Sequence, residues 1–110
     1  MAQYLFLFKG KESEPGDTSP ETQEYARKWT GWMAGLAQSG ALQSGSPLEW
    51  NGKTVSREGT DELRLESFDV GGFLVVNAAS VEEAAEMAKQ APNVALGGQV
   101  VIRPCLEVPS

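Results

Sequence analysis

The chain has 110 residues and a mass of 11.8 kDa, which fits a single domain over residues 1–110. Its net charge of -6 and scattered Lys and Arg residues exclude a generic nucleic-acid surface, because phosphate binding requires clustered cations. Histidine is absent and Cys105 is the single cysteine, so Ser/His and Cys/His dyads, an internal disulfide and a zinc cluster are excluded. We therefore expect neither a cofactor nor a metal.

The N-terminal segment combines aromatic and aliphatic residues. Its apolar run, residues 4–8, is too short for a signal sequence or a membrane span, so we expect a cytosolic protein without a membrane partner. Residues 3–9 are apolar on both faces, which predicts a buried central strand.

A long helix is predicted next. Ser19 is placed as its N-cap and Pro20 fits the first helical position. The helix is expected to stop at Ser39, with Gly40 as its C-cap. Helical spacing predicts one apolar face on this helix, formed by Tyr25, Trp29, Trp32, Met33 and Leu36.

The middle of the chain predicts short, exposed strands. Residues 41–50, "ALQSGSPLEW", are typical of an irregular edge strand because they contain glycine and proline. Asn51-Gly52 predicts a hairpin turn, "KTVSRE" a short strand and "EGTD" a second turn. The alternation in "ELRLESF", residues 62–68, predicts a half-exposed strand with Leu63 on its apolar side.

The segment "FDVGGFLVVNA", residues 68–78, joins a glycine pair to an apolar run. A phosphate-binding loop requires a helix directly after the glycines, whereas a strand is predicted here. Gly71 and Gly72 are therefore interpreted as a bend that leads into a buried strand.

A second helix and a final strand complete the predicted elements. Ser80 and Glu83 form a capping box, and Pro92 is expected to end the helix. Its predicted inner face contains Val81, Ala84, Ala85 and Ala88. "GGQVVIRPCLEV" predicts a closing strand, and Pro104 predicts that this strand lies at an edge or bends there.

This order of elements predicts an α+β protein with a ferredoxin-like βαβ(β)βαβ antiparallel sheet. Both helices would cover one face of the sheet. The other face would be apolar and uncovered, so we expect a partner on it, with a homodimer as the expected assembly.

The ensemble of segments resembles the YCII-related (DGPF-type) domain family. The C-terminal half, "VGGFLVVNAASVEEAAEMAKQAPNVALGGQVVIRP", and the N-terminal pieces "YLFLFKG" and "SPETQEYARKWTGWMAGLAQSGALQSGSPL" are similar to that family. The resemblance implies a ferredoxin-like unit that dimerises face to face into an α+β barrel. Relatives have been linked to dehydrochlorination of aromatic rings, and some adjoin or are fused to sigma factors.

Two features of the family are replaced in this chain. "GTDELRLESFDV", residues 59–70, stands where the family has Asp-Gly-Pro-Phe, and the histidine of a proposed His–Asp pair has no counterpart. The first hypothesis is therefore a YCII-like protein that binds a small molecule without catalysis. The alternative is a small cofactor-free enzyme, lyase- or dehydrochlorinase-like, acting on an aromatic or acidic substrate.

Five residues are candidates for such a site. Asp69 precedes a buried strand and is the candidate catalytic acid or base; a turn cap is the structural alternative. Arg103 is a candidate anion clamp or a salt-bridge partner. Trp32 and Trp50, together with Trp29, are candidates for an aromatic ligand wall, whereas helical spacing favours a core role for the two helical tryptophans.

Overall fold

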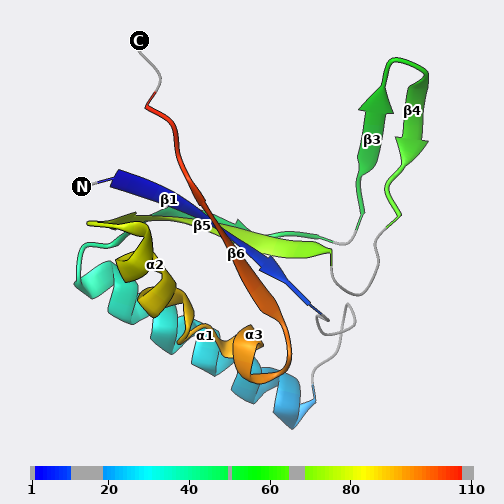
Figure 1. Cartoon of the computed structure of the whole chain (residues 1–110). Coiled ribbons are helices and arrows are strands. Elements are labelled where there is room, and N and C mark those ends of the chain that lie inside the picture. The colour runs from blue at the N-terminus through cyan, green and yellow to red at the C-terminus, as the bar shows by residue number, and fades with distance from the viewer. Residues whose placement is uncertain (1, 11–18, 50, 65–68, 108–110) are drawn as a thin grey trace.

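The computed structural model describes residues 2–10, 19–49, 51–64 and 69–107. Its main sheet contains β1 (Ala2–Lys9), β2 (Leu42–Pro47), β5 (Val70–Ala78) and β6 (Gln99–Pro104) in the order β2-β5-β1-β6, with antiparallel neighbours throughout. The helices α1 (Pro20–Gln38), α2 (Val81–Ala88) and the short α3 (Pro92–Ala95) lie on one side of this sheet (Figure 1). The predicted ferredoxin-like α+β fold is therefore confirmed.

The core lies between the sheet and the helices. Alternating residues of β1 and β5 point toward the helices, and Phe6 and Val76 are fully buried there. α2 packs closely because its inner residues are small: Ala84 and Ala88 are buried. Val81, which was predicted on that inner face, is 42% exposed at the first position of α2.

The predicted helix ends are largely confirmed. The Ser19 hydroxyl accepts a hydrogen bond from the Thr22 amide, and the Ser80 hydroxyl accepts one from the Glu83 amide. Gly40 follows α1 with a φ of 82°, the left-handed conformation that ends many helices. Pro92 does not simply terminate α2; it begins α3, because proline fits the first helical position.

The segment between β2 and β5 departs from the prediction. β3 (Lys53–Ser56) and β4 (Gly59–Glu62) form a separate two-stranded sheet. We call residues 53–62 the arm; each of them is exposed, and the arm projects from the side of the main sheet that lacks helices (Figure 1). The turn lies at Arg57–Glu58, so the prediction of a turn at Asn51-Gly52 was wrong.

The strand predicted over residues 62–68 is formed only at Glu62, the last residue of β4, within its described part. Leu63 and Arg64 follow β4 outside any strand and are exposed, while residues 65–68 lie outside the described residues. The Leu63 amide donates to the Gly52 carbonyl at 3.0 Å, which closes the base of the arm.

The face of the sheet opposite the helices is apolar at its centre. We call it the bare face; Leu5, Leu7, Phe73, Val75 and Val101 belong to it by strand alternation and register, and each is half-buried. No described helix lies over this face (Figure 1).

Candidate functional site

A pocket of about 360 Å³ lies between α1 and the end of the sheet where β2 stops and β5 begins. It is lined by side chains from one face of α1 and by the adjoining ends of three strands. The described lining residues are Phe8, Thr22, Tyr25, Ala26, Trp29, Met33, Ser46, Pro47, Gly71, Gly72, Phe73 and Leu74. This volume falls within the range of ordinary small-molecule sites.

The hollow depends on a glycine on the helix-facing side of β5. Gly72 pairs with Phe8 of β1, and burial alternates from Gly72 to Leu74 along the strand. A Cβ atom at Gly72 would meet the Ser46 carbonyl oxygen at 3.2 Å, the Pro47 Cα at 3.4 Å and the Pro47 nitrogen at 3.9 Å. Because position 72 has no side chain, α1 covers a space at this end of the sheet.

The neighbouring glycine has a different role. Phe8 pairs with Gly72 and Lys9 pairs with Val70, so Gly71 is the extra residue of a β-bulge. Its carbonyl oxygen accepts a hydrogen bond from the Leu48 amide at 2.9 Å. The predicted bend before the strand is thus a bulge within it, and β5 continues directly from both glycines.

Aromatic rings form one wall of the pocket. The Trp29 ring meets the Phe8 ring edge-to-face, with 4.9 Å between centroids, and the Tyr25 ring at 6.0 Å. Trp32 extends this cluster through edge contacts with Phe8 and Trp29 at 5.8 and 5.6 Å. Edge-to-face contacts of this kind stabilise the relative orientation of the rings.

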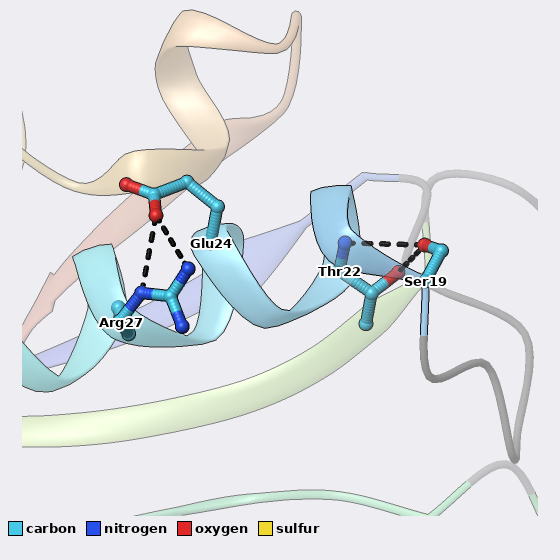
Figure 2. Close-up of polar contacts among 4 residues, drawn as sticks. All are labelled: Ser19, Thr22, Glu24 and Arg27. Carbon is cyan, nitrogen blue, oxygen red and sulfur yellow. Dashed lines mark hydrogen bonds and ion pairs between the residues drawn. The ribbon is translucent and has the colours of Figure 1, made fainter.

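The first turn of α1 forms the polar end of the pocket. Ser19 Oγ donates to Thr22 Oγ1 at 3.1 Å and accepts from the Thr22 amide at 3.3 Å (Figure 2). One turn further, Arg27 donates two hydrogen bonds to one Glu24 carboxylate oxygen on the exposed side of the helix (Figure 2). These bonds, and then the charge of Arg27, lower the pKa of Glu24.

The residues predicted for a site do not converge. Asp69 is half-buried just before β5, two residues from Gly71 of the pocket. Arg103 is exposed on β6, where it pairs with Leu5 on the bare face. Trp32 lines a broad, open groove between α1 and α3 instead of the pocket. Trp50 lies outside the described residues.

Several lining residues were not predicted as part of a site. Tyr25 and Met33 were assigned only to the apolar face of the helix, and their helical spacing gives no sign of a hollow beneath them. Ser46 and Gly72 join the site through strand pairing across a long stretch of sequence. Among the described residues, no group of three or more Cys, Asp or Glu side chains is placed to hold a metal ion.

Among the described helices, none is long and apolar enough to cross a membrane. No curated protein matches the chain. A solved structure with the same fold is 5-chloro-2-hydroxyhydroquinone dehydrochlorinase from Burkholderia phenoliruptrix AC1100, in complex with 2,5-dihydroxybenzoquinone. It is 21% identical, with a TM-score of 0.51 over 90% of each chain. The YCII-related domain family matches residues 2–108. The chain therefore belongs to the YCII-related domain family.

Proposed function

We propose that this protein binds a small ring-shaped molecule in the pocket beneath α1 and that it does so without catalysis. The observation that carries the proposal is the composition of the pocket. Aromatic and aliphatic groups dominate it, and the described lining offers no carboxylate, amine or thiol. General acid–base catalysis needs a group that titrates near the working pH, whereas tyrosine, serine and threonine hydroxyls ordinarily do not.

The shape of the pocket favours a flat ligand. Trp29 and Tyr25 hold their rings at fixed edge-to-face angles, and rings of this kind also pack against a planar guest. The dehydrochlorinase with the same fold was solved with a benzoquinone, which is itself a planar ring. That likeness supports a ring-shaped ligand here.

A homodimer is part of the same proposal. The bare face presents five half-buried apolar residues, and a second copy of the chain covers such a face with equally apolar residues. Light scattering at micromolar protein concentration tests the assembly. A monomer contradicts it and leaves the pocket proposal standing.

Ligand binding is tested with a matched pair of helix variants. Ala26 is exposed and lines the pocket, whereas Ala37 is exposed on the same helix and does not line it. Ala26→Leu should weaken binding of ring compounds found by a thermal-shift screen, while Ala37→Leu should leave it unchanged. Tryptophan fluorescence measures both, because Trp29 lies in the wall. Equal affinity in the two variants would place the ligand elsewhere.

A small enzyme remains the alternative, and one observation favours it. Asp69 is half-buried beside the bulge that forms part of the pocket wall. In this alternative Asp69 acts as acid or base on the bound ring, whereas Arg103, which lies on the bare face across the sheet, takes no part. Asp69→Asn should then abolish turnover of a ligand identified in the screen while preserving its affinity. Unchanged turnover removes Asp69 from catalysis.

A further inference from the structure

We infer that the pocket selects ring molecules that carry no anionic group. This inference deepens the proposed function and rests on it. The described lining contains the hydroxyl residues Thr22, Tyr25 and Ser46 but no lysine or arginine. An anion that enters an apolar pocket loses its hydration, and only a charge partner or several donors offset that loss.

Three basic residues of the described part of the chain, Arg27, Lys9 and Arg103, are directed away from the pocket. Arg27 is bound to Glu24 on the exposed surface of α1. Lys9 follows Phe8, but strand alternation places it on the bare face, and Arg103 lies on that face too. A ring held against Trp29 therefore has the whole sheet between itself and these two cations.

The N-terminus of α1 is also poorly suited to an anion. Helix N-termini bind anions through amide donors that lack partners within the helix. Here Pro20 has no amide hydrogen, and the Thr22 amide already donates to Ser19 Oγ. Glu21 adds a negative charge to the same turn.

The polar atom that β2 offers beside the pocket is a hydrogen-bond acceptor. The Ser46 carbonyl oxygen lies 3.2 Å from the position of a Cβ atom at Gly72, whereas pairing with Phe73 places the Ser46 hydroxyl on the bare face. A neutral phenol or amide has a hydrogen to donate to a carbonyl oxygen, whereas a carboxylate has only acceptors. The net charge of -6 adds a long-range repulsion of anions.

One ligand pair tests the inference within a single measurement. The hydroxyl of 4-nitrophenol ionises near neutral pH, and 4-nitroanisole is its uncharged methyl ether. The chain has no histidine, so few of its own groups titrate between about pH 6 and pH 8. If only the neutral form binds, the affinity for 4-nitrophenol in equilibrium dialysis falls about tenfold for each pH unit above its pKa. The affinity for 4-nitroanisole stays constant.

A charge variant gives the converse result. Ala26→Lys places a cation at the pocket, and Ala37→Lys adds the same charge outside it. Ala26→Lys should raise the affinity for the 4-nitrophenolate ion severalfold, and Ala37→Lys should not.

The outcomes separate the inference from the proposed function. Wild-type protein that binds 4-nitrophenolate as tightly as 4-nitrophenol overturns the charge selectivity and leaves ring binding intact. Binding of 4-nitroanisole that Ala26→Leu does not weaken, or no binding of either compound, overturns the proposed function and this inference together.

Discussion

A methyl group at Gly45 should strongly destabilise the protein, because it disturbs the pairing of β2 with β5 beside the pocket. Gly45 pairs with Leu74 on the adjacent strand β5. A Cβ atom there would lie 2.3 Å from Leu74 Cδ2 and 2.5 Å from the carbonyl oxygen of Phe73. The leucine side chain can move, but the carbonyl belongs to the β5 backbone, so β2 itself must shift.

The expected loss in the free energy of unfolding lies at the upper end of the range for overpacked sites. Introducing extra carbon into a packed site costs typically 1–3 kcal/mol, and a backbone clash places Gly45→Ala near about 3 kcal/mol. With an unfolding entropy of about 2.1 cal/mol/K per residue, 1 kcal/mol corresponds to about 4 °C for a chain of this length. Gly45→Ala should therefore lower the melting temperature by about 12 °C.

Two further glycines calibrate the experiment. At Gly72 the nearest atom to a new Cβ is the Ser46 carbonyl oxygen at 3.2 Å, so alanine should cost less than at Gly45. At Gly35, within α1, nothing lies within 4 Å. Gly35→Ala should raise the free energy of unfolding by about 1 kcal/mol, because alanine favours the helix.

Urea and thermal unfolding followed by tryptophan fluorescence measure all three variants at one protein concentration. The reasoning fails if Gly45→Ala costs less than Gly72→Ala, because β2 would then not pack on β5 in this register. Destabilisation by Gly35→Ala would instead indicate that a partner backbone packs closely on α1.

The remaining predictions concern the core, the assembly and one ion pair. Asn93→Ala should lower the free energy of unfolding by about 1–3 kcal/mol, measured in urea, because the buried amide donates to two strand-end carbonyls; an unchanged midpoint contradicts this. Val75→Glu should convert the proposed homodimer to a monomer in light scattering, whereas Gln43→Glu on the exposed edge strand should not. In an NMR titration the Glu24 carboxyl should have a pKa below that of an ordinary glutamate, and Arg27→Gln should raise it. The pKa of the Glu24 carboxyl is lower in the folded state than in the unfolded state. Any stability that this ion pair contributes is therefore present above the pKa of the unfolded state and is lost as the pH falls through the pKa of the folded state.

The sequence allowed the frame of the fold to be predicted because its signals are local. Ser19 and Ser80 cap the helices as expected, and the apolar run before Asn77 forms a strand of the main sheet. The turn at Asn51-Gly52 was predicted wrongly because a dipeptide signal requires two strands able to pair around it. Pairing of β2 with β5 instead continues to Leu48, which leaves Asn51-Gly52 in the connection to the arm.

The pocket could not be predicted from local patterns. Helical spacing places Tyr25 and Met33 on one face, but a core and a hollow have the same spacing. Whether the space beneath them is filled depends on Gly72, which β1 brings into register with Phe8. That pairing joins residues far apart in the chain, so it follows only from the assembled sheet.

The arm has a consequence for how this domain can vary. Its residues are exposed and its hydrogen-bonded ladder is its own, so its tip tolerates changes of length without disturbing the main sheet. The segment that follows β2, before the arm, is different: the Leu48 amide donates to the Gly71 carbonyl oxygen, which fixes residues beside the pocket wall. Lengthening or grafting at the Arg57–Glu58 turn should therefore be neutral for ligand choice. The same change next to Leu48 would reshape the pocket. The segment between β2 and β5 therefore tolerates changes of length at the tip of the arm but not beside the pocket.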